Sequence, residues 1–173
     1  MDNPTDDESG FCWAYLLDGA GAAKRLSWSE AQAWKPGEGT LWVHLDRRGS
    51  SAQSWLRERS GVDLGTCGAL LAEETRPRSF MDPAGLLLIL RGVNLNPGAE
   101  PDDMMALRIW TERDRVISLR HRVFKATSDV AEAIDAGTGP KSAGGVVVRL
   151  CAHLAERVEP VIENLEDLAD GLE

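Results

Sequence analysis

The segment 154–173 constrains the fold most strongly, because apolar and acidic residues recur there with the period of an α-helix. The apolar stripe has spacings of three and four residues and comprises Leu154, Val158, Val161, Leu165, Leu168 and Leu172. The acidic stripe has the same spacings and comprises Glu156, Glu159, Glu163, Glu166, Asp170 and Glu173. On a helix the two stripes lie roughly 150° apart. The pattern therefore predicts an amphipathic helix with one apolar face and one acidic face.

Two features of this helix bear on its length. Pro160 lies inside the pattern and is expected to kink or divide the helix near Glu159. No glycine follows the last apolar residue, and the last turn has no cationic residue. We therefore expect the helix to continue past Glu173, as in a chain cut in mid-helix.

The charge of the chain is concentrated at its two ends. Of the net charge of −9, residues 1–8 contribute −4 through four acids, and residues 153–173 contribute −6 through seven acids and one base, which leaves about +1 for the rest. Nucleic-acid binding without sequence preference needs a basic face, and the sequence offers none that is visible. Nucleic acid is therefore not an expected partner.

Composition indicates a reduced, globular, intracellular protein. The chain has 173 residues, of which 43% are hydrophobic and 27% charged, enough apolar surface for a packed core. Three scattered cysteines without a Cys-x-x-Cys pair indicate neither a disulfide framework nor a zinc ribbon. No run of 18 apolar residues occurs, so this chain is not expected to cross a membrane by itself. Residues 1–10 are polar and acidic, unlike a signal peptide, and are expected to be a disordered leader.

Strand signals and helix signals alternate through the rest of the sequence. Branched and aromatic residues predict strands at Cys12–Leu17, Gly39–Asp46, Arg78–Met81, Leu86–Asn94, Met104–Thr111 and Val116–Arg120. Helices are predicted at Ala52–Arg59, Gly65–Glu74 and Ser128–Ala136, and from Ala143 to the end. Because Leu86–Asn94 is almost continuously apolar, we expect it to be a central strand covered on both faces.

These elements predict an α/β fold. We expect an αβα sandwich over residues 11–142, with a mixed, partly antiparallel sheet flanked by helices. The long amphipathic helix of residues 143–173 should follow it.

The acidic stripe is a candidate site for cations. Carboxylates three and four residues apart on a helix repel one another, and nearby cations would relieve that repulsion. The stripe could therefore attract divalent cations through its field or bind them weakly. The alternatives are a solvated face and a face paired with arginines of a neighbouring subunit.

Metal ligands are sparse elsewhere. Cys151, His153 and Glu156 form the one cluster of good zinc-ligand types, and His153 and Glu156 share a helix face. Asp102 and Asp103 precede a strand and could ligate a hard cation. A surface histidine, a buried cysteine and solvated acids are the alternative interpretations.

Five arginines lie near or within apolar strands: Arg76, Arg78, Arg91, Arg108 and Arg120. Arg91, Arg108 and Arg120 lie in or at the end of such strands, where an unpaired charge is costly, so we expect them to form structural ion pairs with Glu73, Glu74, Asp102 or Asp103. An anion-binding or intersubunit role is the alternative. The sequence contains no phosphate-binding loop, no Gly-x-Ser-x-Gly and no His-Glu-x-x-His, so we do not expect an enzyme.

Several segments resemble segments of one protein family and occur in the same order along the chain. They are Trp13–Gly19 (WAYLLDG), Leu41–Leu45 (LWVHL), Glu74–Arg78 (ETRPR), Leu90–Asn94 (LRGVN), Leu107–Trp110 (LRIW), Val116–Arg120 (VISLR) and Gly137–Pro140 (GTGP). Together they resemble the CorA superfamily of divalent-cation transporters, in its ZntB or zinc-transport branch, from about Phe11 to Glu173.

The resemblance implies the N-terminal cytoplasmic funnel domain of a homopentameric transporter. In that family a stalk helix, two membrane helices and a Gly-Met-Asn signature follow. The fragment would then form a vestibule or regulatory domain at the cytoplasmic face of the inner cell membrane. It would have no cofactor other than a transported or regulatory cation, zinc or magnesium. A freestanding cytosolic binding or oligomerisation module is the alternative.

Overall fold

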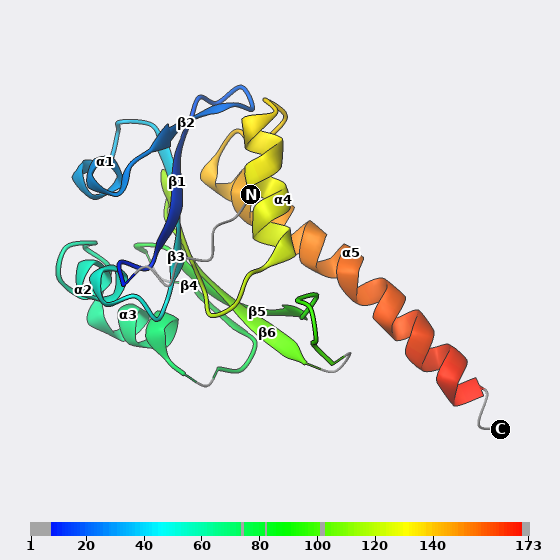
Figure 1. The fold of residues 1–173 in the computed structure, drawn as a ribbon. Helices are drawn as coiled ribbons and strands as arrows, with labels where there is room; N and C mark the ends of the chain where they lie inside the picture. The colour runs from blue at the N-terminus through cyan, green and yellow to red at the C-terminus, as the bar shows by residue number, and fades with distance from the viewer. Residues whose placement is uncertain (1–7, 74, 82, 101–102, 171–173) are drawn as a thin grey trace.

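One seven-stranded sheet organises the chain (Figure 1). The computed structural model describes residues 8–73, 75–81, 83–100 and 103–170, with side chains as far as Glu163 in the last helix. The strand order is β2-β1-β3-β7-β6-β5-β4. The strands are β1 (Phe11–Leu17), β2 (Ala23–Leu26), β3 (Thr40–Asp46), β4 (Arg78–Met81), β5 (Leu86–Val93), β6 (Met104–Thr111) and β7 (Arg115–Arg120).

The sheet consists of two antiparallel blocks joined by one parallel pair. Strands β2, β1 and β3 form one block, and β7, β6, β5 and β4 form the other. Strands β3 and β7 join them in parallel, with Leu41 opposite Arg115 and Leu45 opposite Leu119. The predicted mixed, partly antiparallel sheet is confirmed.

Helices cover both faces of the sheet, which confirms the predicted sandwich. On one face lie α1 (Trp28–Ala33), α2 (Ser50–Glu58) and α3 (Leu64–Leu71), over a core that includes Leu45, Leu56 and Ile89. On the other face lie α4 (Lys125–Asp135) and α5 (Ala143–Asp170), over a core that includes Trp42 and Leu107.

Two local predictions differ from the structure. The apolar strand β5 is second from the edge, because the short β4 pairs outside it with Arg78 opposite Ile89. Helix α1, which begins with a capping box, was not predicted from the sequence. The Ser27 hydroxyl accepts a hydrogen bond from the Glu30 amide (3.2 Å), and the Glu30 carboxylate accepts one from the Ser27 amide (2.8 Å).

Helix α5 projects away from the body (Figure 1). It has 28 residues and runs through Pro160 without a break, so the predicted division does not occur. Its first half packs on the sheet through buried Val146, Leu150 and Leu154, whereas Ile162 farther along is 49% exposed. None of the helices described in the structure combines the length and hydropathy of a membrane span.

The predicted leader is only partly described. Residues 1–7 lie outside the described residues. Gly10 is buried, and its carbonyl oxygen accepts a hydrogen bond from the Asp46 amide at 2.8 Å. The end of the leader therefore packs against the end of β3.

Candidate functional site

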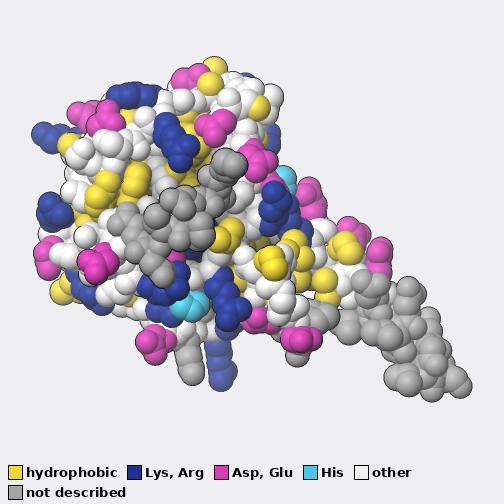
Figure 2. All heavy atoms as spheres, in the orientation of Figure 1, with side chains coloured by type: hydrophobic (Ala, Val, Ile, Leu, Met, Phe, Trp, Pro, Cys, Tyr) yellow, Lys and Arg dark blue, Asp and Glu magenta, His cyan; other side chains and the backbone are white. Residues whose placement is uncertain are grey.

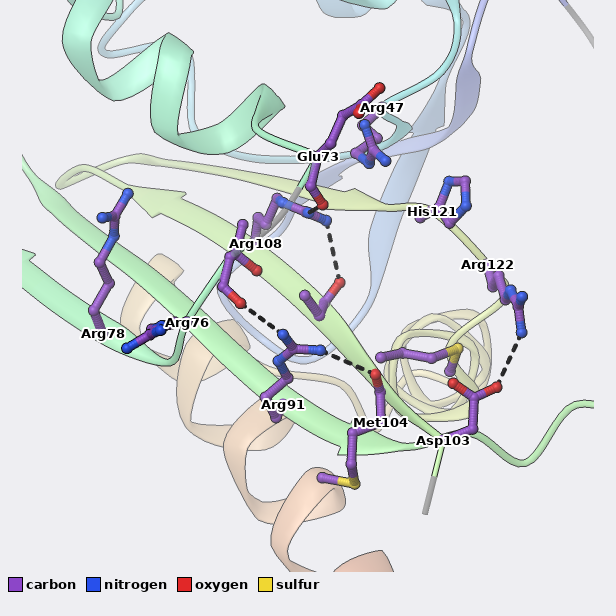
Figure 3. Close-up of a pocket in the computed structure, with 13 residues that line it drawn as sticks. Arg47, Glu73, Arg76, Arg78, Arg91, Asp103, Met104, Arg108, His121 and Arg122 are labelled. Carbon is purple, nitrogen blue, oxygen red and sulfur yellow. Dashed lines mark hydrogen bonds and ion pairs between the residues drawn. The ribbon is translucent and has the colours of Figure 1, made fainter. Parts of the chain in front are cut away.

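A basic cavity lies at one end of the sheet, on the face that carries α2 and α3 (Figure 3). Its volume is about 760 Å³. Six arginines from separate segments line it: Arg47 after β3, Arg76 and Arg78 at the start of β4, Arg91 in β5, Arg108 in β6 and Arg122 after β7. We call this feature the arginine cavity. It contains four of the five arginines selected from the sequence.

The pleat of the strands explains why these residues meet. Along β5, Leu87 and Ile89 face the core under α1–α3, and Arg91 follows two residues later on the same face. Across the strands, Arg78, Ile89 and Arg108 are opposite one another and share that face. On β5 this face therefore changes from apolar Ile89 to cationic Arg91 at the edge of the helical cover, and Arg78 and Arg108 add cations from the neighbouring strands.

Backbone carbonyls hold the two strand arginines in place. Arg108 is 2% exposed, and its Nη2 donates to the Ala72 carbonyl at 2.9 Å and to the Glu73 carbonyl at 3.4 Å. Arg91 donates from Nη2 to the Thr75 carbonyl at 2.6 Å and from Nη1 to the Met104 carbonyl at 3.0 Å.

These partners correct the predicted ion pairs. Within the described residues, neither Arg91 nor Arg108 forms a salt bridge with Glu73 or Asp103, and Glu74 and Asp102 lie outside them. The physical reason lies in α3, which ends at Leu71 and has Ala72 as its C-cap. The last carbonyls of a helix lack intrahelical donors and form the negative end of its dipole, so they accept from a cation.

The cavity has a positive potential. Among the described residues its lining has six arginines and two carboxylates, Glu73 and Asp103, a net charge of +4 with His121 neutral. Burial, followed by the charges of Arg47 and Arg91, lowers the pKa of Arg108 to about 10. Burial and the charges of Arg47 and Arg48 also lower the pKa of His121 below its ordinary 6.5.

Sequence reasoning missed Arg47, His121 and Arg122. A usable signal was present, because Arg47 follows Val43 and Leu45 at a spacing of two, as Arg91 follows Leu87 and Ile89. Arg122 forms an ion pair with Asp103 at 3.1 Å.

Arg120, the fifth predicted arginine, lies outside the cavity. It is one residue from Leu119 along β7 and so points to the opposite sheet face, where its guanidinium lies 6.0 Å from the centre of the Trp13 ring.

The acidic face of α5 differs from the arginine cavity, because its described charges lie exposed along a single helix. Glu156, Glu159 and Glu163 are exposed along the helix, and the side chains of Glu166, Asp170 and Glu173 lie outside the described residues. In Figure 2 acidic side chains follow the projecting helix, whereas basic ones are spread over the body, several of them near the base of the helix. A carboxylate row of this kind can attract cations, but each group remains in water.

The candidate metal ligands do not gather into a site. His153 Nδ1 lies 3.1 Å from Glu156 Oε2, and Asp103 contacts Asn94 and Arg122. Among the residues that the structure describes, no three His, Cys, Asp or Glu side chains are placed to hold one metal ion. Asp102 lies outside that set. Cys151 is half-buried, and burial raises the pKa of its thiol.

The fold defines the class of protein as an αβα domain with a long projecting helix. Residues 37–173 match the family described as CorA-like Mg2+ transporter protein. This match covers more than half of the chain, which therefore belongs to the CorA-like transporter family and is not an enzyme.

Individual relatives refine this assignment. The chain is 44% identical over 170 residues to the divalent cation transporter CmaX of Pseudomonas aeruginosa, covering 96% of this chain and 51% of that protein. It is 29% identical over 161 residues to the zinc transport protein ZntB of Yersinia enterocolitica, covering 93% of this chain and 48% of that protein. The chain thus spans about half the length of the relatives that it matches.

Solved structures agree with the sequence matches. The structure of full-length CmaX has a TM-score of 0.87 at 43% identity, covering 96% of this chain and 52% of that one. The ZntB cytoplasmic domain from Vibrio parahaemolyticus has a TM-score of 0.82 at 25% identity, covering 95% and 66%. The predicted family is confirmed, but the identities do not favour the narrower ZntB branch.

Proposed function

We propose that this chain is the cytoplasmic part of a divalent-cation transporter and forms the vestibule through which cations reach the pore. One observation carries the proposal: 44% identity across 96% of the chain to a divalent cation transporter, together with a TM-score of 0.87 to full-length CmaX. The similar ZntB structure is itself called a cytoplasmic domain. The proposal places the chain at the inner face of the cell membrane, in a homopentamer.

The acidic face of α5 would contribute electrostatics to this vestibule. Its described carboxylates, Glu156, Glu159 and Glu163, are exposed and follow Leu154, the last buried residue among those described in α5. A row of like charges raises the local concentration of counter-ions without a fixed coordination site. Attraction without a fixed site agrees with the arrangement of the described residues, among which no three His, Cys, Asp or Glu side chains are placed to hold one metal ion.

The cargo is proposed only as a divalent cation. The family description points to magnesium and the ZntB relatives point to zinc, whereas the CmaX protein is described simply as a divalent cation transporter. We retain zinc and magnesium as the two candidates, and the higher identity to CmaX removes the preference for zinc.

Transport by the full-length parent in liposomes tests the proposal. Uptake of zinc and of magnesium should be compared with and without an imposed pH gradient, which also reports the energy coupling. We expect uptake of at least one cation above that of empty liposomes. Uptake of neither, by a parent that is correctly folded and inserted, would overturn the proposed function.

A genetic observation separates the proposal from a freestanding cytosolic module. The coding region after Glu173 should encode two hydrophobic spans with a Gly-Met-Asn signature beside them. A stop codon soon after Glu173 would instead support the freestanding module.

A further inference from the structure

We propose that the arginine cavity is a binding site for a small phosphorylated anion that carries at least two negative charges. The site is separate from the acidic face of α5 and plays no part in the cation chemistry proposed above. It rests on the placement of six arginines around one hollow of about 760 Å³.

The first support is a set of guanidinium groups that have donors to spare and no carboxylate partner among the described residues. Arg108 is 2% exposed, and its Nε has no hydrogen-bond partner; the Nε of Arg47 is also buried and without one. Arg76 and Arg78 are exposed and form no side-chain hydrogen bond or ion pair within the described residues. Buried cations are normally paired, so the spare donors of Arg47 and Arg108, together with the exposed Arg76 and Arg78, favour an anionic ligand.

The second support is preorganisation. Arg91 and Arg108 are fixed by backbone carbonyls at 2.6–3.0 Å, so they do not need a ligand to order them. Figure 3 shows Arg47 on one side of this pair, and Arg76 and Arg78 on the other. We assign the direct contacts to these three outer arginines, while the inner pair supplies a fixed positive field.

The chemistry of the lining selects the class of ligand. A guanidinium presents a planar fork of donors that matches the oxygens of phosphate, and several forks can share one phosphate group. The described lining carries a net charge of +4, which one chloride or one carboxylate does not balance, whereas a phosphate carries more than one negative charge near neutral pH. Its volume lies within the range of small-molecule sites, about 300–1,000 Å³.

A small anion fits better than an acidic segment of another protein chain. The most buried charge, Arg108, lies at the centre of the group, and the ends of its guanidinium are near the loop carbonyls of Ala72 and Glu73. A compact polyanion can approach this centre from the opening, whereas a folded acidic surface would reach only the rim. We therefore choose the small anion and treat an acidic partner as an outcome of the test.

Calorimetric titration of the 173-residue chain with inorganic pyrophosphate tests the site. The buffer contains EDTA and no divalent cation, so that cation binding does not contribute. We expect one site per chain. Arg47→Gln and Arg78→Gln should each weaken the affinity about tenfold, because each removes a charge-assisted hydrogen bond. Arg113→Gln, an exposed arginine of the β6–β7 turn outside the cavity, removes the same charge and should leave the affinity unchanged.

A second arm identifies the source of the phosphate. The same proteins are mixed with phosphatidylcholine vesicles that contain phosphatidic acid. Vesicle binding that Arg47→Gln and Arg78→Gln weaken, without pyrophosphate binding, assigns the anion to a lipid headgroup; pyrophosphate binding assigns it to a free metabolite. Urea unfolding of each variant ensures that weaker binding is not loss of fold.

Three results would overturn the site. They are no binding in either arm, binding that Arg47→Gln and Arg78→Gln leave unchanged, and equal competition by chloride at matched ionic strength. Self-association of the chain that these variants abolish, in the absence of phosphate binding, would assign the arginines to an acidic surface of a second copy. None of these results bears on cation transport by the parent, so the two proposals fail independently.

Discussion

The arginine cavity and the acidic face of α5 both gather charges of one sign, but they are assembled in different ways. The carboxylates of α5 come from one helix, at spacings of three and four residues. The arginines come from three strands, β4, β5 and β6, and from three loops, between positions 47 and 122. Local periodicity creates the first cluster, and the pairing of distant strands creates the second.

The two regions also differ in how far their charges are exposed to solvent. Glu156, Glu159 and Glu163 are exposed, so solvent screens their mutual repulsion. Arg108 is buried, and its charge is compensated by carbonyl dipoles rather than by a carboxylate. A charge in the cavity should therefore matter for folding, whereas a charge on the helix should matter mainly for attracting ions.

The largest effect is expected for Arg108→Ala. It removes two donor contacts to the carbonyls of Ala72 and Glu73 and leaves these acceptors at the end of α3 unpaired. We expect the free energy of unfolding in urea to fall by about 2–4 kcal/mol. Arg113→Ala should change it by less than about 0.5 kcal/mol. Equal stability of the two variants would show that the cavity arginine is only a surface charge.

A smaller effect is expected for Arg157→Met, at the point where α5 leaves the body. Arg157 donates to the Asp129 carboxylate of α4 and to the His153 carbonyl, with 23% of its side chain exposed. Because the pair is partly screened, we expect a loss of about 1 kcal/mol in urea unfolding.

Glu163→Gln, farther along the same helix, is the matched control for Arg157→Met and should be neutral. A neutral Arg157→Met would mean that α5 is held to the body by its apolar contacts alone.

The sequence was sufficient for elements whose signal is local. Strand β3 was predicted at Gly39–Asp46 and is found at Thr40–Asp46, because its branched and aromatic residues favour a strand in any context. Helix α1 was missed because it has only six residues, although Ser27 and Glu30 carry its capping signal. The position of β5 could not be predicted, since it depends on which distant strand pairs with it.

The same limit applies to the candidate site. Arg91 and Arg108 were selected for a sound reason, a charge within an apolar strand, but among the described residues their partners are backbone carbonyls and not the carboxylates of Glu73 or Asp103. Arg91 contacts the Met104 carbonyl of β6, and the other carbonyls belong to the end of α3 and the loop after it, for Arg108 more than 30 residues away. Only the folded chain brings that helix end to the strands.

His121 reports the field of the cavity directly. Burial and the charges of Arg47 and Arg48 hold its pKa below 6.5, so the native chain takes up this proton at lower pH than the unfolded chain. The contribution of His121 to stability is thus present above pH 6.5 and is lost as the pH falls below it. In an NMR titration, Arg47→Gln should move this pKa toward 6.5, and Arg113→Gln should not. A pKa that is the same in both variants would contradict a positive cavity.

The smallest effect is expected on the acidic face of α5. Replacing Glu156, Glu159 and Glu163 together with Gln removes like-charge repulsion worth a few tenths of a kcal/mol per pair, so the unfolding free energy should rise slightly at low salt. Adding 150 mM salt should reduce this gain, because screening acts over about 8 Å. Millimolar magnesium should likewise stabilise the original chain and leave the variant unchanged. A magnesium effect of equal size in both chains would place the cation elsewhere. It would contradict the interpretation of the acidic face of α5 as a solvated surface that attracts cations.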